Sequence, residues 1–240
     1  MRTRPPCSTR RASRPRGPSA RPIPGRWRSR GDLDEGDGVQ IVTTYLEQTA
    51  PDQLVPAREP AETLVIARAE EPSPEFTRFL LTAVGGQWHW TDKLDRTWEQ
   101  WWQWVTREGF ETWVAWLHGT PVGYAELMGT VVDGCTEVEV ESFGLLPAFV
   151  GRGFGGHLLT RALQEAWRLD TRWSGLPPVR RVWLHTYTLD SAHALPNYRR
   201  RGFRPYDTRT QDQDVSTDPP GPWPGAGAPR RPTLAGHEIS

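Results

Sequence analysis

The sequence predicts a single mixed α/β domain, an α+β arrangement in which helices flank a mostly antiparallel central sheet. Runs of β-branched and alternating residues occur near both ends and in the middle of the chain. Segments with apolar residues at helical spacing lie between them. Several strands come first, followed by one strand–helix unit and a last strand and helix, and this order favours a mixed sandwich over repeated βαβ units.

The two ends of the chain differ in composition from its middle. The first thirty residues contain ten Arg, six Pro and no acidic residue, so we expect residues 1–36 to form a disordered Arg/Pro-rich arm. A Pro/Gly-rich composition predicts a second disordered tail over residues 208–240. Residues 38–207 remain, which is enough for one domain with a substantial core.

The first half of that domain has two predicted strands and two predicted helices. "VQIVTTYL" from Val39 and "TLVIARA" from Thr63 are typical of strands. A helix of about ten residues is expected to begin at Pro74 and end at Gly85. "TDKLDRTWEQWWQWVTRE" predicts a second helix, capped by Thr91 or Asp92. Its expected apolar face comprises Leu94, Trp98, Trp101, Trp102 and Val105.

In the second half of the domain the spacing of apolar residues changes from helical to alternating. "ETWVAWLHGTPVGYAELMG" predicts a hairpin that turns at residues 119–121, and "TEVEVESFGLL" alternates strictly until Pro147. "GHLLTRALQEAWRLD" predicts a helix, "VRRVWLHTYTL" the last clear strand, and "SAHALPNYRRRGF" a short helix that ends at Gly202. A further strand is expected from Phe203 to Tyr206.

Charge and composition exclude several classes of protein. Residues 31–240 carry 19 basic and 29 acidic residues, which disfavours nucleic acid as a partner of the folded body. No apolar run approaches the ~18 residues of a membrane span, and no signal peptide is recognisable, so we expect a cytoplasmic protein. Two cysteines and six scattered histidines lack metal-binding spacing, so no metal is expected.

The segment "GRGFGG", Gly151–Gly156, satisfies the G-x-G-x-x-G pattern of dinucleotide-binding folds, but its surroundings do not fit those folds. Residues 147–150 separate the preceding strand from the first glycine. Twenty positions on lies Thr171 instead of a ribose-binding acid, and about 100 residues of the domain precede the motif. An NAD-dependent oxidoreductase is therefore disfavoured. The loop still suits a pyrophosphate, because glycine backbone N–H groups and the start of a helix both attract anions.

Residues 136–206 resemble the GCN5-related N-acetyltransferase superfamily. In the frame of its Gln/Arg-x-x-Gly-x-Gly/Ala motif this chain has Val150-Gly151-Arg152-Gly153-Phe154-Gly155, with Val150 in place of Gln or Arg. The strand "VWLHTYT", the helix with Tyr198 and the ending "RRRGF" match the second half of the superfamily, and "GTPVGYAEL" is similar to its central hairpin. Asp190-Ser191 stand where an Asn is usual.

The resemblance implies transfer of an acetyl group from acetyl-CoA to an amine through a ternary complex. It also implies the residues that hold the cofactor: Leu145, Leu146, Val150, Gly151, Arg152, Gly153, Phe154, Gly155, Gly156, His157 and Ser191. The acceptor, a small molecule or a protein, stays open. A catalytically weak acyl-CoA sensor or interaction module of the same fold is the alternative, and homodimers through strand edges are compatible with such folds.

An amine must lose its proton before it attacks a thioester, because a free alkylamine has a pKa of about 10. A carboxylate, directly or through a water, can accept that proton. Strict alternation places Glu137, Glu139 and Glu141 on one strand face that continues to Phe143 and Leu145. The resemblance assigns the general base to Glu139, with Glu141 as the second choice.

The resemblance also assigns the other catalytic groups. The backbone N–H of Leu145 holds the oxyanion, and Gly144 eases the bulge that this needs. Tyr198 donates a proton to the CoA thiolate, whose thiol has a pKa of about 8.5. A core tyrosine packed against Leu195 is the alternative role for Tyr198.

Two further pairs of residues, one of tryptophans and one of histidines, lie outside these motifs. Trp88 and Trp90 fall outside the helical register and either line the acceptor pocket or anchor their loop in the core. His185 and His193 are expected to be structural histidines.

Overall fold

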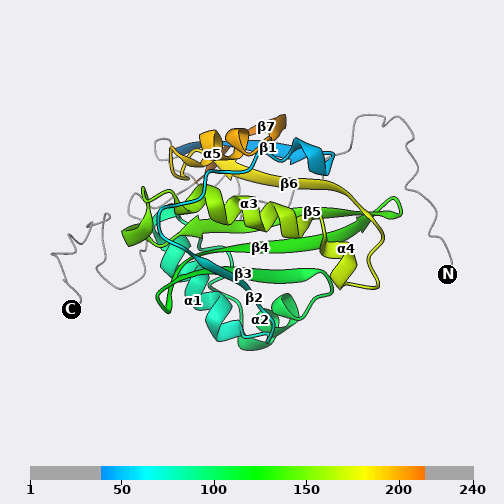
Figure 1. Ribbon diagram of the computed structural model, residues 1–240, viewed down its shortest axis with the longest axis horizontal. Helices are drawn as coiled ribbons and strands as arrows, with labels where there is room; N and C mark the ends of the chain where they lie inside the picture. The colour runs from blue at the N-terminus through cyan, green and yellow to red at the C-terminus, as the bar shows by residue number, and fades with distance from the viewer. Residues whose placement is uncertain (1–38, 214–240) are drawn as a thin grey trace, which may run out of the picture.

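Seven strands form one mixed sheet with helices on both of its faces (Figure 1). The computed structural model describes residues 39–213, so the predicted arm 1–36 lies outside the described residues. The strand order is β2-β3-β4-β5-β6-β1-β7, and among these neighbours only β5 and β6 run parallel. The predicted fold class is confirmed.

The elements follow the sequence pattern closely. The strands are β1 Val39–Gln48, β2 Val65–Ala69, β3 Phe110–Leu117, β4 Thr120–Val132, β5 Cys135–Leu145, β6 Val179–Tyr187 and β7 Arg204–Gln213. The helices are α1 Pro74–Gly85, α2 Trp98–Val105, α3 Phe154–Ala166, α4 Leu169–Arg172 and α5 Ala194–Arg200. Short 3₁₀ turns η1 Pro51–Gln53, η2 Gly86–Trp88 and η3 Pro147–Phe149 connect them.

The first strand of the chain lies far from the second. β1 pairs antiparallel with β6 on one side and with β7 on the other. This pairing extends β7 to Gln213, six residues beyond the expected domain end at 207, because residues 208–213 complete the ladder with residues 39–44. The polar composition of residues 208–213 gave no strand signal. The remaining part of the predicted tail lies outside the described residues.

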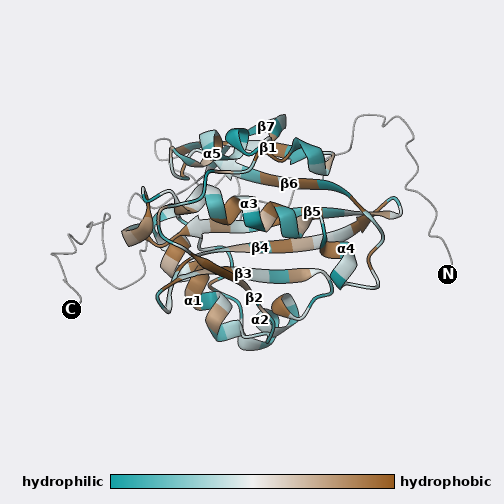
Figure 2. Ribbon diagram, viewed as in Figure 1, coloured by the Kyte–Doolittle hydropathy of each residue, from teal (hydrophilic) through white to brown (hydrophobic). Residues whose placement is uncertain are grey.

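The core fills both faces of the sheet. On one face α3 and α5 bury Leu159, Leu163 and Tyr198 against β5 and β6. On the other face α1 and α2 bury Leu80 and Trp101 against β3 and β4. Figure 2 shows the corresponding hydrophobic colour on β2 and on parts of β4 and α1.

Helix α2 differs from its prediction in start and in face. It begins at Trp98, where Thr97 and Gln100 form a reciprocal capping box, so neither Thr91 nor Asp92 is the cap. Its buried residues are Trp101, Trp104 and Val105. Trp98 and Trp102 are half-exposed and stack on each other with ring centroids 5.5 Å apart. The expected apolar face is confirmed at Trp101 and Val105 and was wrong at Trp98 and Trp102, because two registers at i, i+4 spacing compete in this Trp-rich helix.

A β-bulge in β5 decides which side chains face the site. Glu126 pairs with Ser142 and Leu127 pairs with Val140, which leaves Glu141 as an extra residue. The alternation is thereby shifted, and Phe143 packs on the α3 face together with Val140. Leu145 likewise packs beside Phe154 of α3. The prediction that Phe143 and Leu145 share a face with the glutamates was therefore wrong.

Strands β5 and β6 separate toward their carboxyl ends. Their parallel pairing runs from Thr136 opposite Val179 to Glu139 opposite Trp183 and stops there. Both strands continue, β5 to Leu145 and β6 to Tyr187. The two strand ends thus diverge next to the start of α3.

Candidate active site

The glycine loop, residues 150–156, follows η3 and includes the first residues of α3. Gly151 and Gly153 have φ values of 89° and 84°, a conformation that L side chains rarely adopt. Gly153 is the N-cap of α3, and no side chain caps the helix there. The N–H groups of the first turn therefore remain available to an anion, with the positive end of a 13-residue helix behind them.

The segment before β2 packs along one side of this loop. The Ala57 N–H donates to Thr160 Oγ1 at 2.9 Å, and the Val55 N–H donates to the Arg201 carbonyl at 3.2 Å. A Cβ on Gly156 would lie 3.1 Å from Ala57 Cβ and 2.9 Å from Arg201 Nη1. Gly156 is thus required for close approach of this segment, in addition to any part in binding.

The other predicted cofactor residues have varied surroundings. Arg152 forms an ion pair with Glu62 and lies over the rings of Phe149 and Phe154. Val150 is exposed, and His157 is half-buried in the first turn of α3. At the start of α5, Ser191 accepts hydrogen bonds from the backbone N–H groups of His193 and Ala194.

The orientation of two backbone amides follows from strand geometry. The Leu146 N–H donates to the Val122 carbonyl of β4 at 2.9 Å. Because N–H groups along an extended strand alternate in direction, the Leu145 N–H points away from β4 and toward the diverging end of β6. Leu145 therefore presents a donor at the position where β5 and β6 separate.

Tyr198 of α5 lies in the core beside this position. Its ring meets Phe143 and Phe203 edge-on, with centroids 6.1 and 6.3 Å away, and Leu195 packs against the same cluster. Within residues 39–213 its hydroxyl has no hydrogen-bond partner. Burial raises the pKa of Tyr198 well above its ordinary value, so the phenol stays protonated.

On the opposite face of β5, Glu139 and Glu141 form a carboxylate pair with unequal surroundings. The side chains of both are at most 15% exposed. Burial and the nearby charge of Glu141 raise the pKa of Glu139 to about 7. Burial acts on Glu141 in the same direction, but Lys93 Nζ, 3.2 Å from Glu141 Oε1, outweighs it and lowers the pKa of Glu141 below its ordinary value. Glu139 is thus the member that exchanges a proton near neutral pH.

Lys93 was not singled out by the sequence reasoning. It lies in the segment between η2 and α2 and is 4% exposed. Besides Glu141, its Nζ lies 3.7 Å from Glu126 Oε2 and 4.5 Å from the centroid of the Trp104 ring. The available signal was its rarity, because it is the one lysine among 29 basic residues. Lys93, Asp92, Glu126, Glu139, Glu141 and His185 are called the carboxylate cluster below.

His185 of β6 was expected to be structural, yet it belongs to this cluster. Its Nδ1 lies 3.5 Å from Glu139 Oε1, and its ring centroid lies 5.7 Å from that of Tyr45. Burial lowers the pKa of His185, but Glu139 outweighs burial and the net change is upward. His193 instead contacts Ser191 through its backbone at the entrance to α5, in agreement with a structural role.

Trp90 anchors its loop, as one of the two alternatives predicted. Its indole N–H donates to Asp190 Oδ1 at 3.2 Å, and its ring packs against α1, where Gly85 leaves room for it. The Tyr187 hydroxyl donates to the Trp88 carbonyl at 3.4 Å. Asp190 also accepts from Thr186 Oγ1 at 2.6 Å, which gives this residue a structural reason to depart from the usual Asn.

Residues 39–213 contain neither a metal-binding cluster nor a helix suited to span a membrane. No group of three or more His, Cys, Asp or Glu side chains there could hold a metal ion. In the same part of the chain no helix has the length and apolar character needed to cross a membrane.

Solved structures of N-acetyltransferases are similar to this chain. A GCN5-related N-acetyltransferase from Kribbella flavida is similar with a TM-score of 0.50 and 20% identity, over 75% of this chain and 61% of that one. An N-acetyltransferase of the same kind from Sphaerobacter thermophilus has a TM-score of 0.45 and 19% identity, over 74% and 52% of the two chains. The chain thus spans about three fifths of the length of the first solved structures that it matches.

Comparison by sequence gives a family but no individual relative. No curated protein matches the sequence. The model of the acetyltransferase (GNAT) family matches residues 70–203, which include the carboxylate cluster, the glycine loop and Tyr198. Since this match covers more than half of the chain, the protein belongs to the acetyltransferase (GNAT) family.

Proposed function

We propose that the protein is an N-acetyltransferase that transfers the acetyl group of acetyl-CoA to an amine within a ternary complex. The observation that carries this proposal is the carboxylate pair, in which Glu139 has a pKa of about 7 beside a fixed anion. A general base works best when its pKa lies near the operating pH. Membership of the acetyltransferase (GNAT) family supports acetyl-CoA as the donor.

The glycine loop is the proposed site for the pyrophosphate of acetyl-CoA. Its support is the uncapped first turn of α3 and the open space around Gly151 and Gly153. Charge on the pyrophosphate would be stabilised by the backbone N–H groups and by the helix dipole. Bound there, acetyl-CoA would direct its thioester toward the separation between β5 and β6.

The proposed chemistry uses three groups around that separation. Glu139, directly or through a water, accepts the proton of the ammonium form of the acceptor, and the neutral amine attacks the thioester carbonyl. The Leu145 N–H stabilises the oxyanion. Tyr198 donates a proton to the departing CoA sulfur, a role that its persistent protonation allows.

The glutamates and Tyr198 lie on opposite faces of β5, which suits two separate proton transfers. Glu139 shares its face with α1 and α2, whereas Tyr198 lies on the α3 face. We therefore place the acceptor amine on the Glu139 side and the CoA sulfur on the Tyr198 side. We further propose that residues 38–213 form the catalytic domain and act in the cytoplasm, where acetyl-CoA is available.

The first test is calorimetric titration of the full chain with acetyl-CoA, and with NAD in parallel. Micromolar binding of acetyl-CoA alone is expected, whereas binding of NAD alone would overturn the proposal. Gly153→Ala should weaken acetyl-CoA binding. Gly119→Ala is the matched control, because Gly119 has a φ of 82° and open surroundings but lies in the β3–β4 turn.

Turnover separates the enzyme from the alternative of a sensor. Release of CoA thiol is followed with a panel of amines that includes small amines, aminoglycosides and lysine peptides. The enzyme should release CoA with at least one of them. Tight acetyl-CoA binding without any acetyl transfer would instead identify an acyl-CoA-binding module.

A further inference from the structure

The single lysine of the chain is buried in the carboxylate cluster. The sequence uses arginine for every other basic residue, and Lys93 is 4% exposed. Its ammonium fits between Glu141, Glu126 and the face of Trp104. A lysine is a compact point charge, whereas the planar fork of arginine needs more room and a fixed geometry.

The two glutamates of β5 have different cationic neighbours. Glu141 lies 3.2 Å from the Lys93 ammonium, which carries its charge throughout the neutral range. Burial lowers the pKa of Lys93, but Glu141 and Glu126 outweigh it and raise the pKa above the ordinary value. Among the residues that the structure describes, Glu139 has one such neighbour, the imidazole of His185 at 3.5 Å, and an imidazole is charged only when it is protonated.

This asymmetry has a geometric origin in the bulge. Glu141, the extra residue of β5, lies on the same face as Glu139, and its carboxylate contacts Lys93 in the segment between η2 and α2. Lys93 in that segment is held by Trp104 of α2 and by Glu126 of β4. The ammonium is thereby fixed beside one glutamate and not the other.

We propose that Lys93 is a positioning residue that fixes the negative charge on Glu141 and so leaves Glu139 as the carboxyl group that exchanges its proton with the acceptor. The inference rests on the proposed function. It assigns no contact with substrate to Lys93, and it excludes Lys93 as a nucleophile because its ammonium stays charged.

Groups from every neighbouring element act on this pair of glutamates. Tyr45 of β1 and His185 of β6 interact with Glu139. Glu126 of β4 and Asp92 and Lys93 of the segment before α2 interact with Glu141. Of these, only Lys93 carries a permanent positive charge. Without Lys93, Glu139 and Glu141 should therefore titrate as a coupled pair, and Glu141 should no longer stay ionised while Glu139 takes up the proton.

The test is a carbon-13 NMR titration of the full chain, with glutamate labelled at Cδ and the two resonances assigned through Glu139→Gln and Glu141→Gln. Lys93→Met alone would leave the negative charge of the buried carboxylates without its compensating cation. Lys93→Met is therefore combined with Glu126→Gln, which restores the charge balance and keeps an acceptor oxygen for Ser142. Glu126→Gln alone is the matched control, since it retains the ion pair of Lys93 with Glu141.

In the wild type and in Glu126→Gln, Glu139 should titrate near neutral pH while Glu141 stays ionised from pH 5 to pH 9. In the double variant, Glu141 should titrate within this range and the midpoint of Glu139 should move by at least one pH unit. If Glu139 still titrates near neutral pH and Glu141 still stays ionised in the double variant, the proposal is overturned. If the order of titration depends on Lys93 but the wild type transfers no acetyl group, the proposed function fails while the assignment of Lys93 stands.

Discussion

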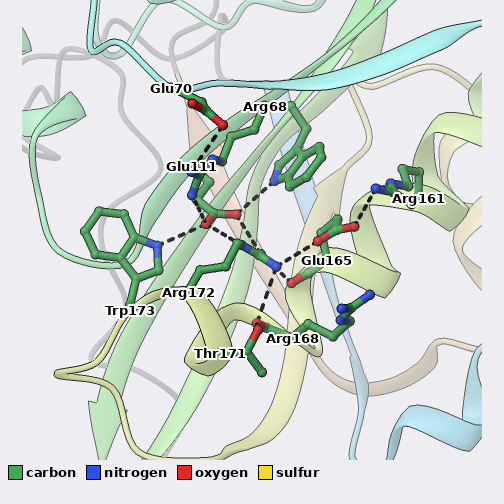
Figure 3. A network of polar contacts seen from close by, with 10 residues as sticks. Arg68, Glu70, Glu111, Arg161, Glu165, Arg168, Thr171, Arg172 and Trp173 are labelled. Atoms are coloured by element: carbon green, nitrogen blue, oxygen red, sulfur yellow. Dashed lines mark hydrogen bonds and ion pairs between the residues drawn. The ribbon is translucent and has the colours of Figure 1, made fainter.

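Two buried glutamates in neighbouring parts of the sheet have opposite surroundings. Glu111 of β3 is 2% exposed and receives five N–H donors, from Arg68, from Nε and Nη2 of Arg172, and from Trp113 and Trp173 (Figure 3). Within residues 39–213, Glu139 of β5 has one ion-pair partner, the imidazole of His185 at 3.5 Å. Burial acts against the charge of both, but the donors around Glu111 outweigh it and lower its pKa, whereas the pKa of Glu139 is raised.

This difference distinguishes a carboxylate with a structural role from a carboxylate that is suited to proton transfer. The network around Glu111 continues through Arg172 to Glu165, so that Glu111, Arg172 and Glu165 each have an oppositely charged partner (Figure 3). It joins β3 to α3 and α4, which are far apart in the sequence. A carboxylate that is fully satisfied holds elements together, and a carboxylate that is poorly satisfied is available for proton transfer.

A hollow beside Glu111 does not change this conclusion. About 210 Å³ of space lies between β2, the first turn of α1 and the end of α2, with Arg68, Glu111 and Trp173 in its wall. These three side chains already bind one another. We therefore expect this region to contribute to stability and not to turnover.

The largest effect is expected from Glu139→Gln. Loss of the general base should lower kcat by roughly 10²–10⁴-fold while the melting temperature changes little. The control is Glu137→Gln, two residues earlier on the same face, where the carboxylate is paired with Arg180 and Arg181. Equal losses of kcat in both variants would show that the comparison between satisfied and unsatisfied glutamates does not predict function.

The reverse pattern is expected from Glu111→Ala. Breaking a buried ion pair typically costs about 3–5 kcal/mol, so the melting temperature should fall by roughly 10 °C. The kcat of the folded fraction should stay within twofold of the wild type by our estimate. Glu70→Ala removes the exposed partner of Arg68 and should cost less than about 1 kcal/mol, as measured by denaturant unfolding.

A smaller effect is expected from Tyr198→Phe, which removes the hydroxyl and keeps the ring in the core. We expect kcat to fall about tenfold, with unchanged acetyl-CoA affinity. A loss below about threefold would remove the acid role and leave Tyr198 as a packing residue. Tyr206→Phe is a control, because that hydroxyl is also buried but lies on β7.

The smallest effect is a shift in pH dependence for Glu141→Gln. The base must be ionised to act, so activity rises as pH increases through the pKa of Glu139. Removal of the like charge lowers that pKa, and the acid limb of kcat/KM should move about one unit toward lower pH. An acid limb that stays in place would mean that Glu141 does not influence the base.

Much of this arrangement could be predicted from the sequence, because local patterns encode it. Alternation in β5, helical spacing in α3 and the glycines before α3 lie within short segments. Comparison with a known family then pointed to Glu139 and Tyr198. These features need no knowledge of which distant segments meet.

The remaining features depend on tertiary contacts. The bulge at Glu141 reverses the side-chain alternation, but its residues look like those of a regular strand. Lys93 becomes important only because α2 and β4 bring Trp104 and Glu126 to it. The insertion of β1 between β6 and β7 joins segments more than 100 residues apart, which no local pattern records.

The most direct test is the pH dependence of kcat/KM from pH 5 to pH 9, measured for the wild type and Glu139→Gln with one acceptor amine. The ratio of the two cancels the titration of the amine itself. We predict that this ratio rises with pH through a midpoint near 7, and that Glu111→Ala retains the same midpoint. A ratio that is constant across the range would contradict the assignment of Glu139 as the base.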